Sequence, residues 1–169
     1  KFQDIFKTSE LVRRAYDFAK KAHQGQKRKN GEPYFNHCLA SAESVAEWGL
    51  DETTVAAALL HDVVEDTYID LDYLERAGFS EEIIAAVDAI SKRENETNRA
   101  YWTRAKANPI AARVKIADMQ HNSCPARTMK LSYAEAEYLG KKYREGLAFF
   151  QSDSHTEKAQ NDPRTADSR

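Results

Sequence analysis

The chain has 169 residues, of which 41% are hydrophobic and 31% charged, and its formal net charge is −2. This length predicts one domain with a single sizeable core. The near-neutral charge argues against a general nucleic-acid-binding or membrane-binding surface, and no stretch approaches the roughly 20 apolar residues of a membrane span. Only six Gly and four Pro accompany long stretches of Ala, Leu, Glu, Lys and Arg, so we expect an all-α fold.

Polar and helix-capping residues divide the first half of the chain into helices. Residues 9–23 carry an apolar stripe at helical spacing, and residues 24–32 form a polar, basic loop with two glycines. Pro33 suits the first turn of a helix that reaches about residue 48. Asp51 suits the N-cap of a third helix, which we expect to continue through His61 and Asp62.

The second half predicts several shorter helices and one long one. Asp70 or Asp72 opens a helix that stops at Gly78, and Ser80 opens another. A loop at 91–98, a short helix at 97–106 and a helix from Asn108-Pro109 to about 123 follow. Pro125 should end or kink that helix. Ser132 and Glu135 then form a capping box for a last helix to residue 150. We therefore expect a domain at 1–150 and a polar, disordered tail at 151–169.

The cysteines favour a reducing compartment. Cys38 and Cys124 are far apart and neither belongs to a Cys-x-x-Cys motif. A structural disulfide or zinc knuckle is therefore not expected, and we predict a cytoplasmic protein.

The segment 56–66 contains the densest chemistry in the chain. An Ala/Leu run ends in His61, Asp62, Glu65 and Asp66. On one helix, His61 and Glu65 lie four residues apart, as do Asp62 and Asp66, so both pairs would share one turn. Burying these groups costs several kcal/mol without compensation, which a bound cation would provide. The alternative is a helix that is apolar at its start and solvated at its end.

Two further segments supply side chains that could join this one. His37 lies in the second expected helix, and Asp118 lies in an otherwise apolar late helix. Together with His61 and Asp62 they make a mixed nitrogen and oxygen donor set, which suits a divalent first-row ion with open positions. The lack of thiolates argues against a closed structural zinc site. Alternatively, His37 is a helix-surface histidine and Asp118 pairs with Lys115.

These motifs resemble the HD-domain superfamily and, within it, the (p)ppGpp hydrolase domain of RelA/SpoT-type enzymes and stand-alone small alarmone hydrolases. The resemblance covers about residues 8 to 150 and implies a helical bundle of about eight helices with a metal site between them. The basic loop before Tyr34 and the Glu-Asp-Thr after His61-Asp62 are more specific than His-Asp alone. The matching segments are 27–37, 57–67, 114–118 and His121-Asn122.

The resemblance also implies roles for individual residues. His37, His61, Asp62 and Asp118 would bind one metal, usually Mn²⁺, and Glu65 and Asp66 would serve the chemistry. Arg28, Lys29 and Asn122 would line the nucleotide site, with Lys115 as a further substrate contact. The bound cation would activate a water, Glu65 would accept or relay its proton, and Arg28 and Lys29 would neutralise phosphate oxygens.

The implied activity is hydrolysis of the 3′-pyrophosphate of ppGpp or pppGpp to GDP or GTP and pyrophosphate. A second reading is another HD phosphohydrolase that acts on a nucleoside monophosphate, a dNTP or a dinucleotide phosphate such as NADPH. A third is a nucleotide-binding module without turnover, against which the Glu65-Asp66 pair argues. The sequence leaves the oligomeric state open. We expect degradation only, because 169 residues leave no room for a synthetase domain.

The family pattern is interrupted after Asp118. Asn122 is retained, but Pro125 stands where the family often contacts base or ribose. Because the pattern is interrupted there, the resemblance leaves the identity of the substrate open.

Overall fold

A computed structural model describes residues 1–152 of the chain, and these residues form the expected all-α fold. Within this range, the only β-type pairing is an isolated bridge between Lys27 and Pro33. None of the described helices is long and apolar enough to cross a membrane. The helices are α1 (Phe2–Thr8), α2 (Glu10–Ala22), α3 (Phe35–Glu47), α4 (Glu52–Leu60), α5 (Val63–Asp66), α6 (Leu71–Arg76), α7 (Glu81–Ile90), α8 (Asn98–Lys106), α9 (Pro109–Asn122), α10 (Pro125–Thr128) and α11 (Tyr133–Gln151).

Capping side chains set most of the helix starts at the predicted positions. Each accepts a hydrogen bond from a backbone N–H of the first turn, which otherwise lacks a partner within the helix. Ser132 and Glu135 form the predicted capping box at the start of α11. The single capping residues are Ser9, Asp51, Asp70, Ser80, Thr97 and Asn108.

The structure corrects the sequence prediction at Pro33 and at the N-terminus, and it adds a short helix at Pro125. Helix α1 was not predicted; its Phe6 ring packs edge-on against Tyr16, with centroids 5.1 Å apart. Such a short helix is stable only through tertiary packing. Pro33 precedes α3 by two residues, because the Tyr34 N–H donates to the carbonyl of Gln26 and holds the loop closed. Pro125 not only follows α9 but occupies the first turn of α10.

The last described helix extends into the first residue of the expected tail. Helix α11 continues through Gln151, one residue beyond the expected boundary at 150. The remainder of that tail, residues 153–169, lies outside the described residues.

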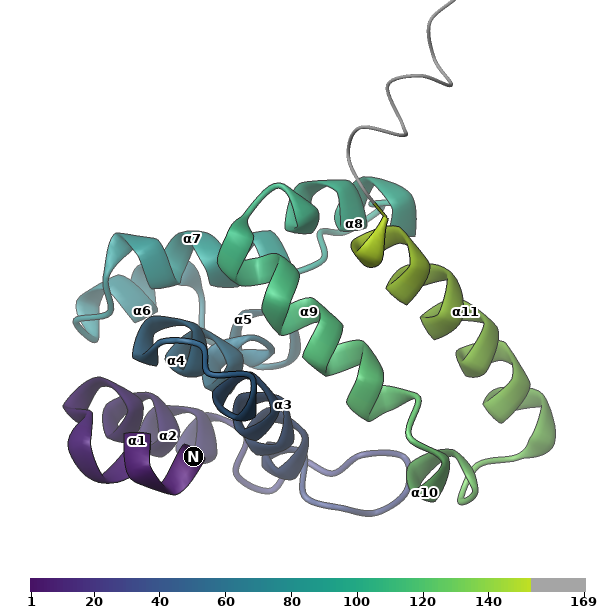
Figure 1. The fold of residues 1–169 in the computed structure, drawn as a ribbon, viewed down its shortest axis with the longest axis horizontal. Coiled ribbons are helices and arrows are strands. Elements are labelled where there is room, and N and C mark those ends of the chain that lie inside the picture. The colour runs from purple at the N-terminus through teal and green to yellow at the C-terminus, as the bar shows by residue number, and fades with distance from the viewer. Residues whose placement is uncertain (153–169) are drawn as a thin grey trace, which may run out of the picture.

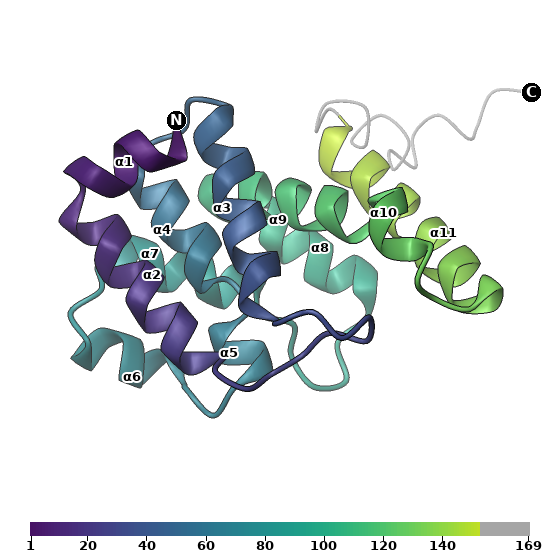
Figure 2. The same ribbon diagram turned by 90° about the horizontal axis from the view of Figure 1, so that it is seen from below.

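Helix α4 lies at the centre of the hydrophobic core, and all of its residues from Thr54 to Leu60 are buried. Helices α2, α3, α7 and α9 pack around it (Figures 1 and 2). A second, smaller cluster joins α8, α9 and α11 through Tyr101, Trp102, Ala105, Met119 and Phe150. Helix α9 belongs to both clusters and therefore places α11 relative to the core.

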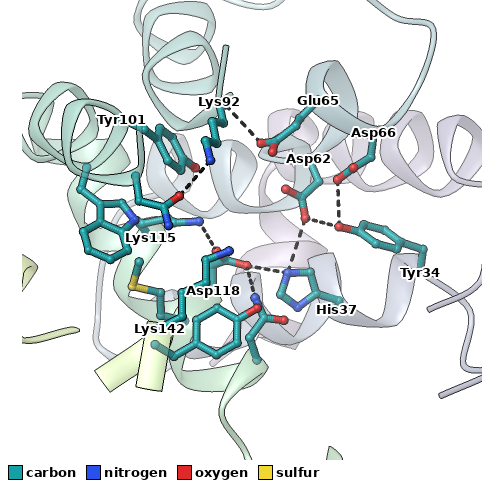
Figure 3. Close-up of a pocket in the computed structure, with 15 residues that line it drawn as sticks. Tyr34, His37, Asp62, Glu65, Asp66, Lys92, Tyr101, Lys115, Asp118 and Lys142 are labelled. Atoms are coloured by element: carbon teal, nitrogen blue, oxygen red, sulfur yellow. Dashed lines mark hydrogen bonds and ion pairs between the residues drawn. The ribbon is translucent and has the colours of Figure 1, made fainter. Parts of the chain in front are cut away.

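The helix expected to run through His61 and Asp62 ends before them. Helix α4 stops at Leu60, and α5 begins at Val63 after a turn at the two residues. The prediction that the pairs His61/Glu65 and Asp62/Asp66 project from one continuous helix was therefore wrong. After the break, Asp62 faces His37 on α3, and α5 carries Glu65 and Asp66 beside it (Figure 3).

Candidate metal centre and pocket

Four buried side chains from three parts of the fold converge on one point. His37 comes from the first turn of α3, His61 and Asp62 from the turn after α4, and Asp118 from α9. One potential ligand atom of each residue lies within 4.8 Å of the corresponding atoms of the other three. Among residues 1–152, this is the one group of at least three His, Cys, Asp or Glu side chains with such spacing.

The shortest distances within the group join imidazole nitrogens to carboxylate oxygens. His37 Nε2 lies 2.7 Å from Asp118 Oδ1 and 3.4 Å from Asp62 Oδ2. His61 Nε2 lies 3.0 Å from Asp62 Oδ2 and 3.5 Å from Asp118 Oδ1. Each of the two rings thus presents its Nε2 atom to the carboxylates of Asp62 and Asp118.

The hydrogen bonds behind the imidazoles fit a metal site. His61 Nδ1 lies 2.6 Å from the carbonyl of Ala58, to which it can only donate, and Nε2 is buried without a hydrogen-bond partner. His37 Nδ1 lies 2.8 Å from Nδ1 of His121. A ligating histidine commonly uses its second nitrogen in such a contact, which fixes the ring orientation. The two Nε2 atoms are therefore oriented to coordinate an ion.

The charges of the group also fit a cation. Burial would raise the pKa of Asp62, but the charge of His61 and the close approach of both imidazole nitrogens outweigh it, and the pKa stays well below its usual range. The pKa of His61 is raised for the matching reason, since its carboxylate neighbours outweigh burial. A proton on His61 and a bound cation would satisfy the same carboxylates. Metal binding should therefore release protons.

Lys115 binds Asp118 on the opposite side from the imidazoles. Its Nζ donates to Asp118 Oδ2 at 2.6 Å, which leaves Oδ1 facing His37. Burial opposes ionisation of Asp118, yet Lys115 and His37 keep its pKa well below the usual range. The pairing that the sequence left open thus exists together with the cluster, and Lys115 also lines the adjoining pocket.

Tyr34 connects the cluster to α5. Its hydroxyl lies 2.8 Å from Asp62 Oδ2 and 2.9 Å from Asp66 Oδ2 (Figure 3). Burial, followed by the charge of Asp62, raises the pKa of Asp66. One hydroxyl proton cannot serve two carboxylates fully, and a proton on Asp66 would resolve the shortage.

Glu65 lies at the wall of the same pocket (Figure 3). Its carboxylate accepts the backbone N–H of Lys92 at 3.2 Å. Part of the side chain is open to solvent, but burial of the carboxylate and then the charge of Asp62 raise its pKa to about 7. Such a carboxylate can exchange a proton near neutral pH.

The predicted substrate contacts are distributed unevenly. Arg28 Nη2 donates to Asn122 Oδ1 at 2.5 Å, and Asn122 Nδ2 donates to Asp118 Oδ1 at 3.0 Å, so this pair adjoins the cluster. Lys29 is largely exposed, and its Nζ lies 4.0 Å from Glu135.

Several pocket residues were not predicted from the sequence. Lys92, Asn98, Tyr101, Lys142 and Tyr143 line the pocket from the α7–α8 loop, α8 and α11. Tyr34 stood within the recognised motif and could have been singled out there. The α11 residues carry no motif, and only the docking of that helix brings them to the pocket.

Similarity to known proteins agrees with this geometry. Residues 15–122 match the HD domain family, so the chain belongs to that family. The chain is 37% identical over 157 residues to a GTP pyrophosphokinase of Streptomyces coelicolor, covering 88% of this chain and 18% of the relative. It is 47% identical over 85 residues to a guanosine-3′,5′-bis(diphosphate) 3′-pyrophosphohydrolase of Aquifex aeolicus, covering 50% of this chain and 12% of that protein. The chain thus spans less than a fifth of the length of either relative.

A solved structure shares the fold. It is described as "A metazoan ortholog of SpoT hydrolyzes ppGpp and plays a role in starvation responses". The TM-score is 0.69 at 22% identity, over 82% of this chain and 86% of that one.

Proposed function

We propose that this chain is a metal-dependent phosphohydrolase that removes the 3′-pyrophosphate of guanosine alarmones and releases GDP or GTP and pyrophosphate. The observation that carries the proposal is the buried His37, His61, Asp62 and Asp118 group beside a pocket that also holds Glu65. The resemblance to a named pyrophosphohydrolase and to a structure described as a ppGpp hydrolase supports the choice of substrate.

The four clustered residues would hold a divalent ion, for which we propose Mn²⁺. Nitrogen and oxygen donors without thiolates suit such an ion. When bound, it would acidify a water molecule and polarise a phosphoryl oxygen. The hydrogen bonds from Lys115 to Asp118 and from Tyr34 to Asp62 would hold the carboxylates in place.

Glu65 would accept the proton of the attacking water, and Asp66 would support it. A raised pKa matches a group that must take up and release a proton near neutral pH. Arg28, Lys29, Lys115 and Asn122 would contact the substrate, and Lys142 supplies a further cation in the pocket. We assign this activity to residues 1–150 and propose a cytoplasmic location, with which the two free cysteines agree.

A nucleotide panel tests the proposal. Protein loaded with Mn²⁺ should release pyrophosphate from ppGpp and pppGpp, and removal of the metal should abolish that release. Nucleoside monophosphates, dNTPs and NADPH serve as competing substrates. Preferred turnover of one of these would replace the alarmone assignment with another phosphohydrolase activity. Tight nucleotide binding without turnover of any of them would assign a binding module.

A further inference from the structure

A pair of oppositely charged side chains holds the loop between α7 and α8. Arg104 comes from α8, and Glu96 comes from the loop itself. Arg104 Nε and Nη2 donate to the two carboxylate oxygens of Glu96 at 3.1 and 3.0 Å, which makes a bidentate ion pair. Both side chains are mostly covered, with exposed fractions of 23% and 13%. Hydrogen bonds from Arg104, and then from the backbone N–H of Arg93, lower the pKa of Glu96 to about 2, so the pair is charged at neutral pH.

The same guanidinium also fixes the end of α7. Arg104 Nη1 donates to the carbonyl of Asp88, and Nη2 donates to the carbonyl of Ser91, each at 2.8 Å. The loop is closed on itself as well, because the Arg93 N–H donates to Glu96 Oε2 at 2.9 Å. Arg104 therefore ties α8, the end of α7 and the far side of the loop to one another.

Between these fixed points lies Lys92, which contacts the candidate catalytic carboxylate. Its backbone N–H donates to Glu65 Oε2 at 3.2 Å (Figure 3). Among residues 1–152, this is the only hydrogen bond that the Glu65 carboxylate forms. Glu65 is otherwise open to solvent on the short helix α5, where a glutamate side chain has several rotamers. The position of the carboxylate at the pocket wall therefore depends on where the loop holds the Lys92 N–H.

We propose that Arg104 is a positioning residue for the hydrolysis, because it fixes the loop whose Lys92 N–H holds the Glu65 carboxylate at the pocket wall. This inference rests on the proposed function, in which Glu65 accepts the proton of the attacking water. Proton transfer needs the base within hydrogen-bond reach of that water, and a displacement of about 1 Å can lower a rate by about 100-fold. Without Arg104, the loop would leave Glu65 free to turn towards solvent.

Arg104 has a competing role as a purely structural cap of α7, because it donates to two carbonyls at the end of that helix. Both roles predict a lower melting temperature when Arg104 is replaced, so stability does not separate them. A positioning role acts through Glu65, and its loss should have no further effect once residue 65 can no longer accept a proton. A structural cap would change turnover by the same factor whether or not Glu65 is intact.

The first experiment measures kcat and KM for ppGpp with the full chain loaded with Mn²⁺. Arg104→Gln should lower kcat by about 10- to 100-fold and leave KM close to the wild-type value. Arg104→Lys, which keeps the charge but not the planar fork, should fall in between. In the Glu65→Gln background, Arg104→Gln should cause no further loss of kcat. Arg113→Gln is the matched control and should behave like wild type, because Arg113 is exposed on α9 and has no hydrogen bond or ion pair within residues 1–152.

A second pair of variants tests the N–H itself. Lys92→Pro removes this donor, whereas Lys92→Ala keeps the donor and removes the same lysine side chain. Ser91 has the extended backbone that a residue before proline needs, with φ −82° and ψ 113°. Lys92→Pro should therefore have a lower kcat than Lys92→Ala, by about the factor that Arg104→Gln loses.

The exchange rate of the Lys92 amide gives a readout that needs no turnover. It is measured by NMR on the metal-free full chain. Loss of the hydrogen bond to Glu65 should raise this rate by about two- to ten-fold in Arg104→Gln, and Arg113→Gln should leave it unchanged.

Three outcomes would overturn the inference. Losses of kcat from Arg104→Gln and Glu65→Gln that multiply would leave Arg104 a structural cap. A Lys92 amide that exchanges equally fast in Arg104→Gln and wild type, or an equal kcat for Lys92→Pro and Lys92→Ala, would show that the loop does not hold Glu65. If Arg104→Gln does not fold, Arg104→Lys and the Lys92 variants still decide. Wild-type protein that hydrolyses no ppGpp, but whose Lys92 exchange depends on Arg104, would reject the proposed function and keep the hold of Arg104 on Glu65.

Discussion

At the scale of single residues, the Tyr34 hydroxyl is the contact that joins the candidate metal ligands to α5. It lies within 2.9 Å of both Asp62 and Asp66, so it restrains one ligand and one candidate catalytic carboxylate. Tyr34→Phe removes this donor and keeps the ring. We expect Mn²⁺ affinity to fall by about 10- to 100-fold, the usual effect of losing a partner that orients a ligand. A metal titration of the purified variant measures this.

Tyr133→Phe provides the control for that titration, because Tyr133 is 83% exposed and lies on α11. It should bind metal like wild type. If Tyr34→Phe also does so, the hydroxyl does not position Asp62.

Substitution of Glu65 should separate metal binding from the chemical step. Glu65→Gln keeps the shape but cannot accept a proton, so we expect normal metal content and a turnover lower by ~10²–10⁴. The pKa of Glu65 is about 7, so wild-type turnover should rise as pH increases through this range. A bound cation would move the inflection below that value. The pH profile of the hydrolysis rate is the measurement.

The exposed Glu82 on α7 provides the matched Gln variant, which should leave the profile unchanged. Folded Glu65 has a raised pKa, so its ionisation lowers stability as the pH rises from its unfolded pKa to about 7, and the full loss remains above that pH. Metal-free Glu65→Gln should therefore melt slightly higher than wild type at neutral pH. Full activity in this variant would transfer the role of base to Asp66 or to the water itself.

At the scale of helices, the docking of α11 on α8 and α9 depends on Gly146. A Cβ atom there would lie 2.5 Å from Met119 Cε and 3.2 Å from Trp102 Cζ2. Gly146→Val should cost about 1–3 kcal/mol, as is usual for overpacking. The melting temperature should fall by roughly 2–4 °C per kcal/mol. Because α11 carries Lys142 and Tyr143 into the pocket, KM for the nucleotide should rise as well.

Gly140→Ala is the control on the same helix. Its Cβ would meet only the flexible end of Arg144, at 3.1 Å. The gain in helix propensity of about 1 kcal/mol should then raise the melting temperature. A Gly146→Val variant that melts and binds like wild type would mean that α11 does not need this close approach.

At the scale of the whole molecule, the candidate metal site joins α3, the end of α4 and α9, which are the helices of the main core. A ligand that binds only the folded state stabilises it by about 2.7 kcal/mol at 100 times its dissociation constant. We expect Mn²⁺ to raise the melting temperature by several degrees and a chelator to reverse this. His61→Ala should abolish the increase.

Asp72→Asn, at an exposed position on α6, should retain the full response to metal. A melting temperature independent of Mn²⁺ in wild type would contradict a structural link between the ion and the core. Elemental analysis of His61→Ala and Asp62→Ala would then show whether these residues bind metal at all.

Local signals in the sequence determined most of the helix starts and named the four residues that meet in the candidate metal centre. A capping Ser, Asp, Asn or Thr acts within its own first turn, so Ser9, Asp51 and Asn108 could be read without knowledge of the fold. The Tyr34–His37 and His61–Asp66 motifs were equally local. Their chemistry indicated a cation site before any distance was known.

Tertiary packing decided what depends on which surfaces meet. Segment 56–66 has the spacing of one continuous helix, but the helix breaks after Leu60. Burial of α4 and the contacts of Asp62 outweigh the local preference for a continuous helix. Helix α1 is held by tertiary packing, which includes the Phe6 ring against Tyr16 of α2. Arg28 and Arg127, 99 residues apart in the chain, donate to the same oxygen of Asn122, and Lys142 reaches the pocket because α11 docks on α9. Such contacts join distant segments, and spacing along the chain carries no information about them.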